Sequence, residues 1–306
     1  MRAAILVAGN LEGFAETSGD HFELEEQMSF LLPAFQAAGI TLETVRWQEA
    51  AERAGEFDAM LPLLVWDYVE ADNLSLFKEA MAQVTPKTLL LNPLPVIEWN
   101  GHKGYLDELR QLGAPTIPTI RASAPFEASV VEEAFTTFQC DQIVIKPAVG
   151  ANSWRQVLLR QGDPLPSQSE LPPGEALIQP FLTSVKDEGE FSFVYFDGTF
   201  SHALRKVPRS GDYRIQPTYG GTQSQYHPTE EDKALVESIL QLISFGSLLY
   251  VRVDLLRGND GLLKLIELEM IEPFLYLATA PTHDDGFNRG AWLLASALRK
   301  RISDLK

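Results

Sequence analysis

The chain has 306 residues and a mass of 34.1 kDa, enough for one large core or for two or three compact lobes. Its net charge of -17 argues against nucleic-acid binding, and no apolar run is long enough to span a bilayer. Cys140 is the only cysteine, which excludes an intrachain disulfide and makes a cytoplasmic location the expectation.

The first 95 residues alternate short strands and helices, a pattern that predicts an N-terminal lobe built on an open parallel sheet. Strands are expected at 3–8, 42–47, 57–63 and 87–92, and helices at 25–38 and 74–84. Ligands of such sheets bind at the carboxyl ends of the strands, where Asn10, Glu12 and Trp66-Asp67-Tyr68 lie. Loop capping explains these residues equally well.

A second part, 96–182, is expected to follow a linker that starts at Pro93-Leu94-Pro95. Helices are predicted at 104–112 and 126–138, and strands at 141–147, 156–159 and 176–182. The strand at 141–147 brings Lys146 to its end, just before the small residues that begin the loop 148–155. Such a loop can bring backbone N–H groups against phosphate oxygens, while a lysine supplies a point charge.

The third part, 183–306, has the pattern of an antiparallel sheet. A hairpin is expected at 190–206, with Asp197-Gly198 as a type I′ turn, followed by a loop at 208–221. A long helix at 230–245 and a last helix at 290–302 flank a second hairpin, whose turn is Arg257 to Gly261.

The second hairpin carries an unusual set of carboxylates. Side chains alternate between faces along a strand, so a symmetric turn places Asp254 across from Glu267 and Arg252 across from Glu269. The same alternation puts Ile266 on the opposite face, with Leu268. Opposed carboxylates must take up a proton or hold a cation, and oxygen ligands suit magnesium or manganese. The alternative is a solvent-facing acidic strand.

Several phrases, in this order along 92–277, resemble the ATP-grasp superfamily, in its glutathione-synthetase-like and ribosomal-modification-ligase-like branch. The likeness extends to the group of the D-cycloserine biosynthesis cyclo-ligase. The phrases are Trp99-Asn100-Gly101-His102-Lys103-Gly104-Tyr105-Leu106, Val144-Ile145-Lys146-Pro147-Ala148, Gly189-Glu190-Phe191-Ser192, Phe196-Asp197-Gly198 and Glu267-Leu268-Glu269-Met270-Ile271-Glu272-Pro273. The resemblance implies an α/β ATP-grasp fold, with an N-terminal lobe at 1–95, a central lid part at 96–182 and a C-terminal antiparallel subdomain at 183–306.

The resemblance also implies roles for individual residues. Phosphate contacts fall to Lys103, Lys146 and the loop at Gly150, and the adenine would lie against Gln179, Phe181 and Leu182. Asp187, Glu188 or Glu190 would reach the ribose. Arg205, Lys206 and Arg214 would face the transferring phosphoryl group, and Asp254, Glu267 and Glu269 would hold magnesium. Each of these residues alone could equally be a solvated surface residue.

The function implied is an ATP-dependent ligase that joins a carboxylate to an amine or related nucleophile through an acyl phosphate. The substrate would be a small molecule or a peptide, with no nucleic-acid or membrane partner, and a homodimer stays open. Gly150 is the only glycine in 148–155, a loop usually richer in glycine, and many relatives carry asparagine where Glu269 stands. A catalytically degenerate ATP-binding module and a small-molecule kinase are therefore the alternatives.

Overall fold

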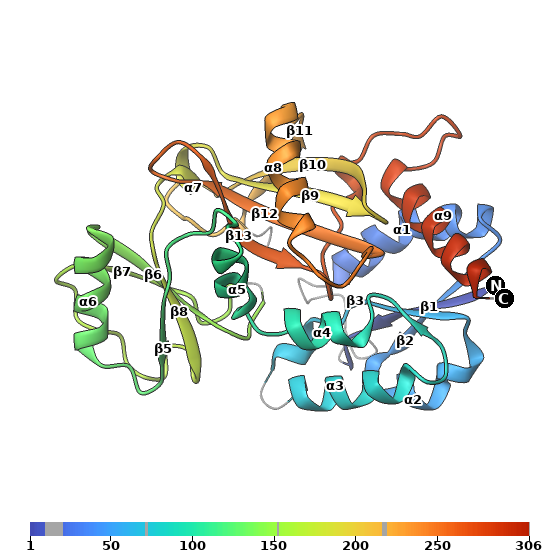
Figure 1. Ribbon diagram of the computed structural model, residues 1–306, viewed down its shortest axis with the longest axis horizontal. Coiled ribbons are helices and arrows are strands. Elements are labelled where there is room, and N and C mark those ends of the chain that lie inside the picture. Colours follow the sequence, from blue (N-terminus) through green and yellow to red (C-terminus); the bar gives the residue numbers. More distant parts are fainter. Residues whose placement is uncertain (10–20, 71–72, 152, 216–218, 306) are drawn as a thin grey trace.

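The computed structural model describes residues 1–9, 21–70, 73–151, 153–215 and 219–305, which form three sheets. The expectation for Asn10 and Glu12 falls outside these ranges. Figure 1 shows the three sheets side by side, with the two chain ends close together at the right.

The N-terminal lobe is the predicted parallel sheet. Its strands are β1 (Arg2–Val7), β2 (Thr41–Arg46), β3 (Ala59–Leu64) and β4 (Leu89–Leu90), and they lie in the order β2-β1-β3-β4. The larger helices of this lobe are α1 (His21–Ala37) and α3 (Asn73–Val84). Four short helical segments join the strands: η2 (Trp47–Glu49), α2 (Ala50–Arg53), η3 (Ala54–Glu56) and η4 (Trp66–Val69).

The linker expected after residue 92 is instead a helix, α4 (Leu94–Asn100). Pro93 is its N-cap and Pro95 lies in its first turn, where the missing N–H of a proline costs no hydrogen bond. The sequence prediction was wrong here because it took these prolines as helix breakers. The expected helix after it is α5 (Tyr105–Gln111).

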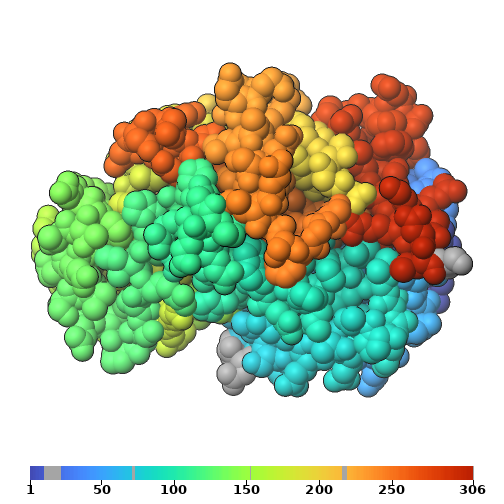
Figure 2. Space-filling model, in the orientation of Figure 1, coloured from blue at the N-terminus to red at the C-terminus, as the bar shows by residue number. Residues whose placement is uncertain are grey.

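The central part holds a four-stranded antiparallel sheet in the order β5-β8-β6-β7. Its strands are β5 (Ile120–Ser123), β6 (Gln142–Pro147), β7 (Val157–Arg160) and β8 (Glu175–Pro180), and α6 (Ala128–Phe138) packs on it. This sheet has a core of its own, formed by residues between Phe126 and Ile178. It forms the green lobe at the left of Figure 1 and Figure 2.

The largest sheet is antiparallel, in the order β11-β10-β9-β12-β13. Its strands are β9 (Glu190–Phe196), β10 (Thr199–Val207), β11 (Thr222–Tyr226), β12 (Tyr250–Arg257) and β13 (Leu263–Glu269). The short helix α7 (Ser184–Asp187) precedes it, α8 (Glu230–Gln241) covers one face, and η6 (Leu277–Thr279) and α9 (Arg289–Asp304) follow. Asp197 and Gly198 both have positive φ, 48° and 75°, which confirms the predicted turn.

The N-terminal lobe and the large sheet share one hydrophobic core. Phe35 and Leu31 of α1 belong to the same buried cluster as Val194 of β9, Tyr250 of β12 and Leu298 of α9. The core thus runs between residues far apart in the sequence, while the boundaries at 95/96 and 182/183 stay a prediction.

Two buried asparagines fix the connection between the N-terminal lobe and this sheet. The Asn92 amide donates to the carbonyl oxygens of Tyr250 and Met270, at 2.8 Å each, and accepts from the Leu249 N–H at 2.8 Å. Asn100 likewise donates to the Leu268 carbonyl at 2.9 Å and accepts from the Met270 N–H at 3.0 Å. Asn92 therefore satisfies backbone groups at the start of β12 and just beyond β13, and Asn100 satisfies groups at the end of β13 and just beyond it.

Of the helices in the described ranges, none combines the length and the apolar character needed to cross a membrane.

Candidate active site

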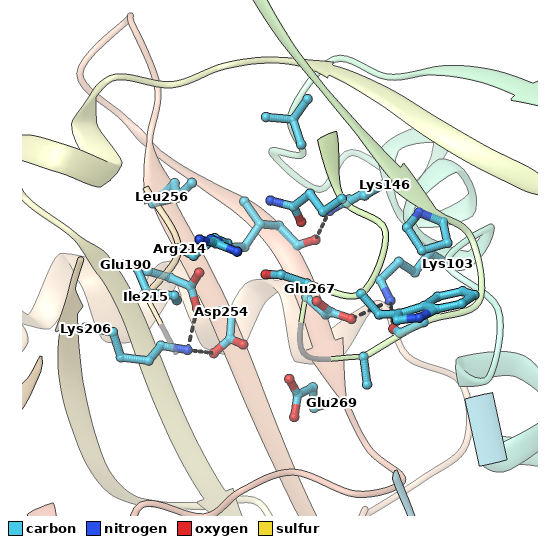
Figure 3. Close-up of a pocket in the computed structure, with 18 of the residues that line it drawn as sticks. Lys103, Lys146, Glu190, Lys206, Arg214, Ile215, Asp254, Leu256, Glu267 and Glu269 are labelled. Carbon is cyan, nitrogen blue, oxygen red and sulfur yellow. Dashed lines mark hydrogen bonds and ion pairs between the residues drawn. The ribbon is translucent and has the colours of Figure 1, made fainter. Parts of the chain in front are cut away.

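A cavity of about 540 Å³ lies where the three sheets meet, and Figure 3 shows it in close-up. Most of the predicted site residues line it: Lys103, Lys146, Gly150, Gln179, Phe181, Leu182, Glu190, Lys206, Arg214, Asp254, Glu267 and Glu269. They come from positions between 103 and 269, so the fold gathers in one cavity what the sequence spreads over more than half of the chain.

Three predicted residues lie elsewhere. Asp187 is exposed at the end of α7, and Glu188 pairs with Arg257 at 2.7 Å, so neither lines the cavity. Arg205 follows the alternation of β10: its neighbour Lys206 faces the cavity, which turns Arg205 to the other face. The geometry therefore favours Glu190 over Asp187 and Glu188 as the ribose contact. It likewise favours Lys206 over Arg205 as the residue that faces the transferring phosphoryl group.

The acidic hairpin has the predicted register, with Asp254 paired to Glu267 and Arg252 to Glu269. The register then shifts by one residue, since Leu255 pairs with Leu265. Ile266 is the extra residue of this bulge. Ile266 lines the cavity but, unlike Leu268, is not part of the buried cluster of this sheet, whereas the sequence alternation predicted that the two share a face.

Asp254 lies at the centre of a buried charge network. Arg252 contacts its carboxylate at 2.9 Å, Lys206 lies at 3.6 Å, and the Ser192 hydroxyl also donates to it. Burial alone would raise the pKa of Asp254, but Arg252 and Lys206 outweigh it and lower the pKa to about 2. Lys206 also pairs with Glu190, and Figure 3 shows it between the two carboxylates.

Glu267 and two lysines form a second group on the other side of the cavity (Figure 3). The Lys103 ammonium lies 2.9 Å from the Glu267 carboxylate and donates to the Gly150 carbonyl at 2.6 Å. Lys146 donates to the Ile266 carbonyl at 3.4 Å, so the bulge supplies its acceptor. Burial lowers the pKa of Lys146 to about 8, although Glu267 opposes the shift. An anionic ligand next to Lys146 would raise this pKa again and so stabilise the protonated ammonium.

Asp254, Glu267 and Glu269 share one face of the cavity, but cations hold them apart. Arg252 pairs with both Asp254 and Glu269, and Lys103 pairs with Glu267. Within the described part of the chain, no three acidic, histidine or cysteine side chains are close enough together to hold a metal ion. The oxygen donors still suit a hard divalent cation. A bound nucleotide would bring phosphates that compete for these lysine and arginine side chains, and the carboxylates would then be free to bind the ion.

The predicted adenine side of the cavity is apolar. Phe181 and Leu182 follow β8 and are buried. Val144, Leu256 and Ile215 also line the cavity and belong to the same apolar cluster as Phe181. The Gln179 amide is held by the Thr119 hydroxyl at 2.9 Å. Arg214 lines the cavity too, where it pairs with Asp212 at 2.8 Å and lies over the ring of Tyr219.

The sequence interpretation gave no role to Arg252 or Glu272, and it weighed Tyr68 as a ligand contact no more than as a loop cap, although all three line the cavity. Arg252 could have been found, because it shares a face with Asp254 two residues later. Tyr68 and Glu272 are 204 positions apart, and only the shared core of the lobe and the large sheet brings them together.

This arrangement of three sheets around a charged cavity is the fold of the ATP-grasp ligases, which confirms the resemblance seen in the sequence. Two solved ligase structures match the chain over almost its full length. D-alanine–D-alanine ligase from Bacillus anthracis, complexed with ATP, has a TM-score of 0.66, 15% identity and 99% coverage of both chains. The ATP-grasp ligase PsnB, complexed with minimal precursor, Mg and ADP, has a TM-score of 0.60, 14% identity and coverage of 99% and 97%.

A more similar relative is the cycloserine biosynthesis protein DcsG of Streptomyces lavendulae, 28% identical over 292 residues, or 90% of this chain and 95% of that protein. The crystal structure of D-cycloserine synthetase DcsG has a TM-score of 0.81 and 24% identity, and covers 99% of this chain and 100% of that one. Residues 12–92 match the family described as D-cycloserine synthetase DcsG, N-terminal domain. The chain therefore has the fold of the ATP-grasp ligases and is similar in sequence to DcsG.

Proposed function

We propose that the protein is a magnesium-dependent ligase that uses ATP to convert a substrate carboxylate to an acyl phosphate, which an amine or related nucleophile then attacks. The observation that carries this proposal is the convergence of Lys103, Lys146, Lys206 and Arg252 with Glu267 and Asp254 in one cavity. Such a site holds the charges of a phosphoryl transfer without a covalent nucleophile of its own.

The two lysines beside Gly150 would bind the nucleotide phosphates. Lys146 has no ion-pair partner among the described residues, only the Ile266 carbonyl, and its lowered pKa reflects that deficit. Phosphate oxygens would remove the deficit. Lys103 would exchange its contact with Glu267 for a phosphate, which would free the Glu267 carboxylate.

The freed Glu267, with Asp254 and Glu269, would hold the magnesium ion, which supplies positive charge next to the phosphates when it is bound. Arg252 and Lys206 would then keep the carboxylate acceptor and the transferring group in line, because both remain charged and nearly fully buried. Arg214, which also lines the cavity, would contribute a further positive charge.

The acceptor side of this proposal comes from the relatives. The matched proteins are a D-cycloserine synthetase, a D-alanine–D-alanine ligase and a ligase complexed with a minimal precursor. The cavity is lined by residues of the central part, 96–182, and by Trp66 and Tyr68 of the N-terminal lobe. We assign the central part the role of the lid and take a small molecule as the substrate.

The proposal is tested by assaying release of ADP and phosphate with Mg·ATP and a panel of amino acids, with hydroxylamine added to trap an acyl phosphate as a hydroxamate. Lys146→Ala should weaken ATP binding about tenfold, or 1.4 kcal/mol, in calorimetry, because it removes a phosphate contact. Lys233→Ala, on the outer face of α8, is the matched control. Unchanged ATP affinity in a folded Lys146→Ala variant, or ADP formation without a trappable hydroxamate, would contradict the assignment.

A further inference from the structure

The end of the cavity beneath the N-terminal lobe carries a carboxylate without a cation. Glu272 follows β13 by three residues and lines the cavity with Tyr68, which lies in η4 at the carboxyl end of β3. The Tyr68 hydroxyl interacts with the Glu272 carboxyl and lowers its pKa, while the carboxyl raises the pKa of the phenol. Within the described ranges, no lysine, arginine or histidine forms an ion pair with Glu272, so the phenol is its one polar side-chain contact here.

The nearby cations are already engaged. Lys103 lies 2.9 Å from Glu267, and Arg252 is bound to Asp254 and Glu269. Burial therefore dominates at Glu272 and raises its pKa to about 7, while Tyr68 and Lys103 compensate only in part. An uncompensated carboxyl in a cavity favours a ligand that brings a positive charge.

The surrounding side chains fit the same kind of ligand. Trp66, Phe274 and Tyr276 also line the cavity, and aromatic faces attract cations. The ring of Tyr276 already has the Lys206 ammonium at 5.4 Å and the Arg252 guanidinium at 5.3 Å from its centroid. A ligand ammonium here would thus meet a carboxylate and aromatic rings.

We propose that Glu272, held by Tyr68, binds a protonated amine of the substrate and thereby selects amine-bearing substrates over their hydroxy analogues. This inference rests on the proposed ligase function and names the substrate class. Arg252 and Lys206 attract the carboxylate of the same substrate, whereas Glu272 repels it. A molecule that carries both groups is therefore bound in one orientation, with its carboxylate toward the phosphoryl donor.

The test measures ADP release at saturating Mg·ATP for the wild type, Glu272→Gln, Glu272→Asp and Tyr68→Phe. The probes are the twenty standard L-amino acids, D-alanine and D-serine, with L-lactate and D-lactate as analogues that lack the amine. Glu70→Gln is the matched control, since it makes the same change at an exposed position two residues from Tyr68. Circular dichroism confirms that each variant is folded.

We expect at least one amino acid to accelerate ADP release and neither lactate to do so. Glu272→Gln should lose at least tenfold in kcat/KM for that amino acid, mainly through KM, while the KM for ATP stays within twofold. Glu272→Asp should recover part of the loss, because the charge remains, and Tyr68→Phe should give an intermediate loss. Glu70→Gln should behave as the wild type.

The outcomes separate this inference from the proposed function. Two outcomes would show that the amine site is wrong while the ligase assignment stands. In the first, Mg·ATP binds in calorimetry but no amine accelerates ADP release; in the second, Glu272→Gln keeps the wild-type preference for an amino acid over lactate. A magnesium requirement that shifts in Glu272→Gln would make Glu272 a metal ligand and overturn the amine site as well. Absence of Mg·ATP binding would overturn both.

Discussion

At the scale of single residues, the chemistry of the cavity depends on which charges have partners. Asp254 is neutralised by Arg252 and Lys206, so it stays ionised in spite of burial. Glu272 lacks such partners and has a raised pKa. The same residue type thus serves as a fixed anion at one position and as a group that titrates near neutral pH at another.

The raised pKa of Glu272 predicts a pH-dependent stability. The folded carboxyl has a pKa of about 7, against 4.5 for an unperturbed glutamate, so across this interval the folded state binds more protons than the unfolded state. Its contribution to the free energy of unfolding is therefore full below about pH 4.5 and is lost as the pH rises to about 7. Glu272→Gln should abolish this dependence.

Urea melts of the ligand-free wild type and Glu272→Gln at several pH values between 5 and 8 measure the difference. We expect the variant to gain stability relative to the wild type as the pH rises, by about 1.4 kcal/mol for each effective unit of pKa shift. A difference between the two proteins that is constant over this range would show that Glu272 is ionised and well compensated in the folded protein.

At the scale of elements, the acidic hairpin shows how far sequence reasoning reaches. Strand alternation and the turn position predicted the pairing of Asp254 with Glu267 and of Arg252 with Glu269, since both depend only on local geometry. The bulge at Ile266 leaves no mark in the hydrophobic pattern, because an isoleucine is acceptable on either face. Strand β11 was not predicted either, because it is largely polar and lies at the edge of its sheet, so its sequence has no hydrophobic strand pattern.

The candidate site was predicted only as far as local features of the sequence indicate it, like the hairpin. Residues such as Lys146, at a strand end before a loop, were found from local pattern and family resemblance. Arg205 was misplaced because two adjacent cations, Arg205 and Lys206, give no sign of which one faces inward until the sheet is known. The approach of Glu272 to Tyr68 depends on contacts between distant parts of the chain, and no local sequence pattern contains that information.

Glu267→Gln tests the role of the hairpin in binding metal and nucleotide. In the ligand-free protein Glu267 pairs with Lys103, so the substitution should change the melting temperature little. Magnesium with a non-hydrolysable ATP analogue should raise the melting temperature of the wild type by mass action, and should raise that of the variant much less.

The matched control for this experiment is Glu133→Gln, an exposed position on α6. It should show the full ligand-induced shift. An equally large shift in Glu267→Gln would mean that the carboxylates of the hairpin do not hold the metal–nucleotide complex, and that they form only an acidic face of the cavity.

At the scale of the whole molecule, the N-terminal lobe and the large sheet are joined by a common core and by Asn92. Asn92→Ala would leave three buried backbone groups without partners, each worth about 1 kcal/mol or more. We expect a loss of about 3 kcal/mol in the free energy of unfolding, measured by urea denaturation.

Asn259→Ala, in the exposed turn of the acidic hairpin, is the control and should change stability by less than about 0.5 kcal/mol. A loss in Asn92→Ala no larger than in the control would show that water replaces the lost amide, and that the shared core alone joins the two parts.

The shared core has a consequence for the thermodynamics of ligand capture. Tyr68 from the lobe and Arg252 and Glu272 from the large sheet are set in place before any ligand arrives, because folding has already fixed their backbones relative to one another. The acceptor end of the cavity is preorganised, so binding there costs little further conformational entropy. The sheet of β5, β6, β7 and β8 has its own core, so in the closure proposed above the entropy of ordering would be lost mainly in this sheet. Calorimetry should therefore show entropies of nucleotide and acceptor binding that differ in sign or size. The unfavourable entropy of ordering the protein should be larger for binding of the nucleotide.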